Sequence, residues 1–537
     1  MQMNRKWIQI TITMTLLLIH LIAADNSYDD DNDAEGEMLS LELVHRHDAR
    51  FGGDDVDQVE AVKGFIQRDL WRREKMINHR KGINQQDHHH HHLHRRKEME
   101  VRKEFQMPMH SGRDYAVGEY FVEVEVGTPG QSFWLVADTG SELTWFNSIP
   151  NNHHSIDNLP HPQRKKHHKH PHHQHHPHQP GKHKHKHKHK GSKTKTKSKK
   201  KTKSRQPKSR TAKDDPNDPC NGIFCPHRSH TFKQLPCSSK ICTQDLSGVF
   251  SLSYCPNHSD PCLFDISYAD GSSATGFFGI DTLSLNLTNG KQGKLENLTI
   301  GCTQSVLNGI TFNENTGGIL GLGFAKGSFV DKASLKYNTK FSYCLVDHLS
   351  HRNVSSYLTF GNPKVKLLAE KKTTELFLYQ PFYGVNVTGI SVGREMLDIP
   401  PRVWDFEAQG GMIIDSGTTL AALVQDAYEP VVEALKKSLS HVKKVDKSLG
   451  DLDFCFESEG FDPSSVPSLV FHFGGGVKFA PPVKSYVIDF GPNVKCLGFV
   501  PINGTGVSVI GNIMQQSHLW QIDVYQNTVS FAPSRCS

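Results

Sequence analysis

Hydrophobic residues are scarce in this sequence and make up only 36% of its 537 residues. This fraction is low for a chain that is compact throughout, so some segments should lie outside any folded core. Long helical patterns are also few, whereas short strand-like segments and glycine-rich turns recur. The sequence therefore predicts an all-β fold. The chain is too long for a single hydrophobic core, which favours two packed lobes plus additional segments.

Acidic residues are absent between Asn158 and Lys213, where 20 lysines and arginines accumulate. Removing these charges from the formal net charge of +6 leaves −14 for the rest of the chain. The folded part should therefore be acidic, and the overall positive charge does not point to a nucleic-acid-binding fold. Nothing in the wider stretch 147–218 can bury a core, so we expect a disordered His/Lys-rich insert there.

Three interpretations of the insert remain open. It can be a tolerated surface loop, a weak and salt-sensitive binder of polyanions such as DNA, or a weak binder of metal through its histidines. Aromatic residues are not interleaved with the basic ones, so base stacking is not expected. The histidine spacing is repetitive rather than typical of a metal site, so we assign no metal ligands.

A second long apolar run is also lacking, so no membrane span is expected in the mature protein. The first run, residues 8–22, follows Arg5 and Lys6 and precedes Ala23-Ala24, which is the pattern of a cleaved signal peptide over residues 1–24. A membrane anchor is the alternative, but the run is short and an acidic stretch follows at once.

Residues 25–107 are highly charged and unlike the strand-rich region that follows. Apolar residues between Val59 and Trp71 fall at helical spacing. We interpret residues 25–107 as a pro-segment, with a plain disordered spacer as the alternative.

Two features indicate the secretory pathway. Cysteine is absent before Cys220, and the eleven cysteines include no CxxC pair, so disulfides are favoured over a zinc site. Six Asn-x-Ser/Thr sequons are candidate glycosylation sites. They lie at Asn257, Asn286, Asn297, Asn353, Asn386 and Asn503.

One motif occurs twice, and it carries the chemistry. An apolar pair is followed by Asp138-Thr139-Gly140-Ser141 in the first half and by Asp415-Ser416-Gly417-Thr418 in the second. The first copy follows a strand expected at 132–137, which comes after an alternating strand-like segment at 120–126 and a turn. A single copy would be weak evidence, but two copies in matching strand contexts, one in each half, point to a paired site.

Paired aspartates at such turns are suited to peptide hydrolysis, which needs an activated water and a proton donor. Two carboxyl groups about 3 Å apart, as in pepsin, cannot both ionise and therefore share one proton. We expect Asp138 and Asp415 to be this catalytic pair. The glycines allow the backbone to pass close behind the carboxylates. The hydroxyls of Thr139 and Ser416 can lock the two turns together.

The two motifs resemble those of the pepsin (A1) family of aspartic proteases. Three further segments narrow the resemblance to its atypical plant branch, the nepenthesin-like enzymes. These segments are FSYCLVDHLS (341–350), VKCLGFV (494–500) and VIGNIMQQ (509–516). The resemblance covers residues 115–536 except the insert. It implies two six-stranded-barrel-like lobes with a cleft between them, and an aspartic endopeptidase that needs no cofactor.

Two further site residues are implied by the resemblance. Family members close a tyrosine-bearing hairpin, the flap, over the substrate, and Tyr268 matches that tyrosine between strands expected at 263–266 and 276–285. A packed strand tyrosine is the alternative. Trp145, seven residues after Asp138, matches the tryptophan that supports the flap tyrosine, and core packing is its alternative.

The resemblance also implies disulfides, because nepenthesin-like enzymes carry twelve cysteines in six bridges. The expected pairs are Cys237–Cys262, Cys242–Cys255, Cys344–Cys536 and Cys455–Cys496. This chain has one cysteine fewer. Either Cys220 or Cys225 bridges to Cys302, or Cys220 and Cys225 pair locally, and one thiol is left over in every case.

The sequence thus predicts an aspartic endopeptidase made as a zymogen and acting on polypeptide substrates at acid pH, as a monomer. The lobes are expected at 108–365 and 366–537. A catalytically inactive pepsin-fold binding or inhibitor protein is the alternative. We expect an extracellular or vacuolar location, with the chloroplast as the alternative.

Overall fold

The structure is a computed structural model of the chain. The described residues are 105–111, 118–148, 220, 222–247, 249–268, 272–287, 291–307, 317–350, 356–445, 452–491, 493–504 and 506–536. The expected signal peptide, nearly all of the expected pro-segment, residues 149–218 of the insert, and Asn353 lie outside this part of the chain. All described residues except Cys220 belong to one compact unit. None of their helices has the length and apolarity that a membrane crossing requires.

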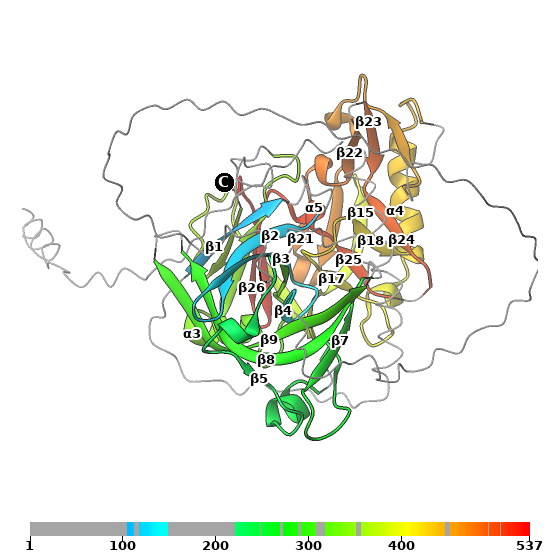
Figure 1. Cartoon of the computed structure of the whole chain (residues 1–537). Helices are drawn as coiled ribbons and strands as arrows, with labels where there is room; N and C mark the ends of the chain where they lie inside the picture. Colours follow the sequence, from blue (N-terminus) through cyan, green and yellow to red (C-terminus); the bar gives the residue numbers. More distant parts are fainter. Residues whose placement is uncertain are drawn as a thin grey trace, which may run out of the picture. The chain divides into compact units, whose positions relative to one another are not determined.

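An N-terminal lobe is built from strands of one mixed sheet, which contains the expected strand at 120–126 (Figure 1). Its longest pair is the antiparallel hairpin β8–β9. Buried and partly exposed positions alternate in the second half of β2, and the apolar side chains of the strands fill the core. The strands are β2 (Tyr120–Val126), β3 (Gln131–Asp138), β4 (Thr144–Phe146), β5 (Lys233–Gln234), β6 (Ser253–Tyr254), β7 (Leu263–Ser267), β8 (Ser273–Asn286), β9 (Gln292–Leu307) and β10 (Gly318–Gly321).

Six antiparallel strands connect the two halves of the chain, in the order β1-β12-β11-β26-β27-β13. Three of them come from before residue 365 and three from after it. They are β1 (Phe105–Ser111), β11 (Lys340–Cys344), β12 (Ser356–Phe360), β13 (Lys372–Tyr379), β26 (His518–Asp523) and β27 (Thr528–Pro533). Because β11 pairs with β26 along its whole length, the two lobes share a continuous hydrogen-bonded sheet.

Strand β1 crosses the expected end of the pro-segment at residue 107. Phe105, Met107 and Met109 are fully buried, and the strand pairs with both β12 and β2. The expected boundary therefore falls inside a strand of the folded unit.

The C-terminal lobe has a central group of strands and two smaller sheets. The central strands are β14 (Phe382–Val385), β17 (Met412–Ile414), β18 (Ala421–Val424), β24 (Phe499–Ile502) and β25 (Ser508–Ile510). One small sheet contains β15 (Val387–Val392), β16 (Glu395–Met396), β20 (Leu469–Phe473) and β21 (Lys478–Phe479). The other contains β19 (Cys455–Glu457), β22 (Val487–Gly491) and β23 (Val494–Leu497). The described part of the chain is thus mostly β and bilobal.

Helices are few and mostly short in the described part of the chain. The α-helices are α3 (Phe329–Lys336), α4 (Gln425–Ser438) and α5 (Asn512–Gln515). Short turns are η4 (Pro226–Arg228), η5 (Ile241–Asp245), η6 (Pro401–Trp404), η7 (Pro463–Ser465), η8 (Gly474–Gly476) and η9 (Val483–Ser485). Helix α4 and the residue after it bury a stripe of apolar side chains, from Tyr428 to Leu439, against the C-terminal lobe.

The disulfides agree with the expectation at two positions and differ at two. Cys344–Cys536 and Cys455–Cys496 are present. The structure pairs Cys237 with Cys255 and Cys242 with Cys262, so the expected pairs Cys237–Cys262 and Cys242–Cys255 were wrong. The sulfur atoms of Cys242 and Cys255 lie only 3.4 Å apart. In so tight a group of sulfurs, the pairing cannot be read from sequence order.

The three remaining cysteines follow one of the open alternatives. Cys302 is a free, buried thiol, and burial raises its pKa well above the usual value. Cys220 and Cys225 are both disulfide-bonded, which agrees with their local pairing rather than with a bridge to Cys302.

Candidate active site

Asp138 is the last residue of β3, and its carboxylate is held by the turn that follows. Its Oδ1 accepts a hydrogen bond from Gly140 N at 2.9 Å, and its Oδ2 accepts one from the Ser141 hydroxyl at 2.6 Å. The side chain is only 1% exposed. These donors hold the carboxylate in one orientation.

Asp415 follows β17 directly and has the same environment. Its Oδ1 accepts from Gly417 N at 2.8 Å, and its Oδ2 accepts from the Thr418 hydroxyl at 2.6 Å. It is 3% exposed. The two copies of the motif therefore fold into equivalent turns, one in each lobe.

The two turns are locked together by Thr139 and Ser416. Thr139 N donates to the Ser416 hydroxyl (3.1 Å), and Ser416 N donates to the Thr139 hydroxyl (2.8 Å). Each hydroxyl also donates across to the other lobe: that of Ser416 to Ala137 O at 2.9 Å and that of Thr139 to Ile414 O at 3.4 Å. Four hydrogen bonds thus join the two turns, and two of them are reciprocal between residues 277 positions apart.

The turn after Asp138 lies directly against the Asp415 carboxyl group. A Cβ atom added at Gly140 would lie 2.8 Å from Asp415 Oδ2 and 2.9 Å from its Cγ. Only a glycine allows this approach without moving the carboxylate. Gly140 therefore permits the close meeting of the two motifs.

Each turn is supported from behind by a strand with a hydrophobic-Gly sequence. Strand β10 runs parallel to β3 and places Gly321 opposite Asp138, and Leu322 N donates to Asp138 O at 2.7 Å. Strand β25 runs parallel to β17, and Asp415 N donates to Ile510 O at 3.2 Å. In each lobe, a neighbouring parallel strand thus holds the backbone of the aspartate in place.

Tyr268 and Trp145 meet in the N-terminal lobe. The Trp145 indole N–H donates a hydrogen bond to the Tyr268 hydroxyl, and the ring centroids are 6.4 Å apart. Tyr268 directly follows β7, and β7 pairs with β8 to form the two arms of a hairpin. The tip, residues 269–271, lies outside the described residues.

Comparisons with known proteins agree with this geometry. The chain matches the family described as xylanase inhibitor N-terminal over residues 120–216 and 206–362, and xylanase inhibitor C-terminal over 382–533. It is 30% identical to "Aspartyl protease family protein 2" of Arabidopsis thaliana over 447 residues, which cover 81% of this chain and 74% of that relative. The chain belongs to the plant aspartic protease family.

Further similarities place this plant aspartic protease family member among related sequences and folds. It is 27% identical over 432 residues to "Aspartic proteinase nepenthesin-1" of Nepenthes gracilis, with 78% of each chain covered. The crystal structure of edgp has the same fold, with a TM-score of 0.58 at 17% identity, covering 82% of this chain and 97% of that one. At this identity, the structural likeness concerns the fold alone.

In the family member, two polar side chains near the C-terminus bind the backbone of the Asp415 turn, and the sequence motifs did not predict them. Gln515 of α5 donates to Asp415 O at 3.0 Å and accepts from the Tyr343 hydroxyl at 2.7 Å. Asn512 donates to Ser416 O at 3.1 Å and to Gly118 O at 2.9 Å. Both residues belong to the segment VIGNIMQQ (509–516), which supports the family resemblance but to which the sequence alone assigned no role in the site.

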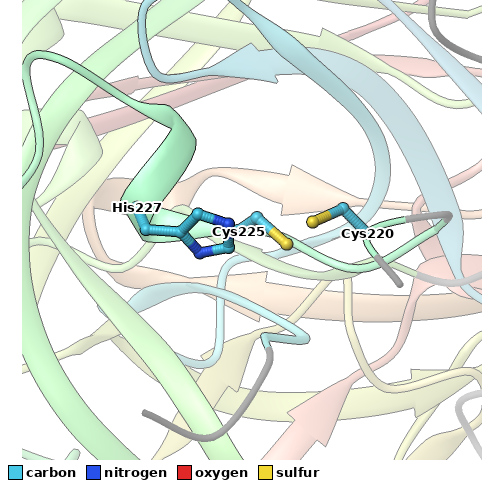
Figure 2. A group of neighbouring side chains, drawn as sticks. All are labelled: Cys220, Cys225 and His227. Carbon is cyan, nitrogen blue, oxygen red and sulfur yellow. The ribbon is translucent and has the colours of Figure 1, made fainter. Parts of the chain in front are cut away.

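A group of possible metal ligands in the family member is explained by a disulfide. Figure 2 shows Cys220, Cys225 and His227, whose sulfur and ring nitrogen atoms lie within 4.8 Å of one another. Both cysteines are disulfide-bonded, and a metal would need free thiolates. A second group in the described residues consists of Cys237, Cys242 and Cys255, which are disulfide-bonded as well.

The described sequons of the family member lie mostly at the surface. Four asparagines are exposed and one, Asn386, is half-buried. The exposed ones are Asn257, Asn286, Asn297 and Asn503. Their exposure leaves room for a glycan at each.

Replacing Trp145 by Phe should lower kcat/KM of the family member towards a peptide substrate about tenfold. The change keeps the ring but removes the N–H that positions the Tyr268 hydroxyl, and a lost buried hydrogen bond costs about 1 kcal/mol or somewhat more. Steady-state kinetics of the purified variant measures this.

Trp404→Phe is the matched control for this experiment. Trp404 is buried in the C-terminal lobe, and its indole N–H has no hydrogen-bond partner among the described residues. Equal losses in both variants would show that the Trp145–Tyr268 hydrogen bond does not support the reaction.

Proposed function

We propose that this protein is an aspartic endopeptidase in which Asp138 and Asp415 together activate one water molecule. The interlocking of the two Asp turns carries the proposal: two reciprocal hydrogen bonds join Thr139 and Ser416, and their hydroxyls donate two more to backbone oxygens of the opposite lobe. The close approach of Gly140 to the Asp415 carboxylate supports it further.

In the proposed reaction, the dyad shares one proton. The ionised carboxyl takes a proton from water as the water attacks the scissile carbonyl, and the protonated carboxyl polarises that carbonyl and supplies the proton for the leaving amine. Gly140 N and Gly417 N, with the hydroxyls of Ser141 and Thr418, keep both carboxyls in place. Tyr268, held by Trp145, would cover the substrate.

The finer features of the proposal rest on the sequence. We propose a secretory zymogen that acts at acid pH as a monomer and is located outside the cell or in the vacuole. The signal-like N-terminus, the disulfides and the exposed sequons support this. Segments 341–350, 494–500 and 509–516 resemble the chloroplast-type plant aspartic proteinase NANA, so the chloroplast is the alternative location.

A purified, processed enzyme offers the direct test of activity. It is incubated with a denatured, reduced protein between pH 3 and 7, with and without pepstatin, and the fragments are identified by mass spectrometry. We expect cleavage at internal bonds that is strongest at acid pH and blocked by pepstatin. Absence of cleavage by a folded, processed protein would favour an inactive binding or inhibitor protein with this fold.

A further inference from the structure

Glu142 is a buried carboxyl group directly after the first catalytic turn, and the proposed reaction does not use it. It is 5% exposed. Its Oε1 accepts a hydrogen bond from Ser251 N at 2.9 Å, while its Oε2 is buried without a hydrogen-bond partner among the described residues. Burying an ionised carboxylate oxygen without a hydrogen-bond donor costs free energy, so this environment favours the neutral form of the carboxyl group.

The hydrogen bond to Ser251 connects the catalytic turn to a segment more than 100 residues away. Residues 249–252 lie within the loops closed by the disulfides Cys237–Cys255 and Cys242–Cys262. Phe250 in this segment packs edge-on against Phe382 of the other lobe, with ring centroids 5.7 Å apart. Glu142 thus holds a segment that touches both lobes.

The charge that acts on Glu142 is that of Asp138. Burial is the largest influence and raises the pKa of the Glu142 carboxyl, hydrogen bonds from Ser251 and from its own backbone oppose this, and the negative charge of Asp138 adds the smallest contribution, which raises the pKa. Strand β10, which packs against the backbone of Glu142, has no charged residue, and neither has segment 249–252. The coupling is reciprocal, so an ionised Glu142 makes it harder for the dyad to lose its shared proton.

We propose that Glu142 is a positioning residue for the dyad. It ties segment 249–252 to the catalytic turn, and its buried carboxyl group, four residues after Asp138 in the chain, sets the pH at which the dyad gives up its shared proton. This inference rests on the proposed endopeptidase function.

Glu142→Gln and Glu142→Ala separate the two roles. The amide oxygen of Gln can still accept from Ser251 N, so kcat/KM at the pH optimum should stay near that of the wild type, whereas Ala should lose about tenfold. In the Gln variant the alkaline limb of the kcat/KM profile should move towards acid, since a nearby negative charge has been removed. The acid limb should stay unchanged.

Thermal unfolding gives a readout that does not depend on activity. A carboxyl group with a raised pKa in the folded state stabilises the protein at low pH and loses this contribution as the pH rises through that pKa. The Tm of Glu142→Gln relative to wild type should therefore increase by about 2 °C or more between pH 4 and pH 7. Glu395→Gln makes the same charge change at an exposed site and should show neither effect.

The outcomes are distinguishable. If the wild type cleaves peptides but the Gln variant has an unchanged alkaline limb and an unchanged Tm difference, Glu142 is only a packing residue and the inference is wrong. If Glu142→Ala does not fold, the Gln variant alone decides. If the wild type cleaves nothing, the endopeptidase proposal fails and the dyad role of Glu142 fails with it, whatever the unfolding data show about its charge.

Discussion

Asp415→Asn is expected to lower peptide cleavage by at least about 10³-fold while leaving the fold intact. An amide cannot share a proton with Asp138 or take one from water. It is nearly isosteric with the carboxyl group: its oxygen can still accept from Gly417 N, and its NH2 group, in the place of Oδ2, can donate to the Thr418 hydroxyl. The turn should therefore keep its shape. Fragment release from a denatured protein at acid pH measures the loss, and Asp138→Asn should behave in the same way.

Asp398→Asn provides the matched control, because Asp398 is exposed in the C-terminal lobe and lies outside the site. Its activity and secretion should equal those of the wild type. Circular dichroism and Tm should be alike for all the variants. Substantial residual cleavage by a pure Asp415→Asn protein would refute the assignment of the dyad.

Gly140→Ala is expected to reduce kcat/KM about 10²-fold through geometry alone. The added Cβ would lie 2.8 Å from Asp415 Oδ2, a distance that real Cβ atoms essentially never show, so the carboxyl or the turn must move. Displacing a reacting group by about 1 Å is enough for a loss of this size. No titratable group changes, so the loss should appear at every pH. Steady-state kinetics across pH 3–7 tests this.

Gly389→Ala is the control for the glycine substitution. A Cβ at Gly389 would lie 3.0 Å from Met396 Sδ, the end of a flexible side chain that is 55% exposed and can move aside. This variant should keep wild-type activity. If Gly140→Ala is equally active, the close approach of the two motifs is not required for the reaction.

The sequence predicted the parts of the site that depend on local chemistry. Both Asp turns, their glycines and their hydroxyls follow from one short motif that occurs twice, because strand, turn and hydrogen-bond donors are encoded within a few residues. The resemblance placed Trp145 and Tyr268 together, although they are 123 residues apart, and the structure shows their hydrogen bond.

Contacts made by tertiary packing could not be read in this way. Gln515 and Glu142 look like ordinary polar residues in the sequence, and only the folded chain shows that Gln515 binds the backbone of Asp415 and that Glu142 is buried and bound by Ser251. The pairing of Cys237 and Cys242 also depended on which sulfur lies nearest in space. Strand β1 was likewise not predicted, because it begins inside the charged segment that was interpreted as a pro-segment.

A crystal structure with a peptide-like inhibitor tests the central claim most directly. The inhibitor should carry a hydroxyl in place of the scissile carbonyl, and the crystals should be grown at acid pH. We expect this hydroxyl to lie within hydrogen-bond distance of the carboxyl oxygens of both Asp138 and Asp415, with Tyr268 above the inhibitor. A hydroxyl that contacts neither carboxyl group, or only one, in a fully occupied complex would contradict it.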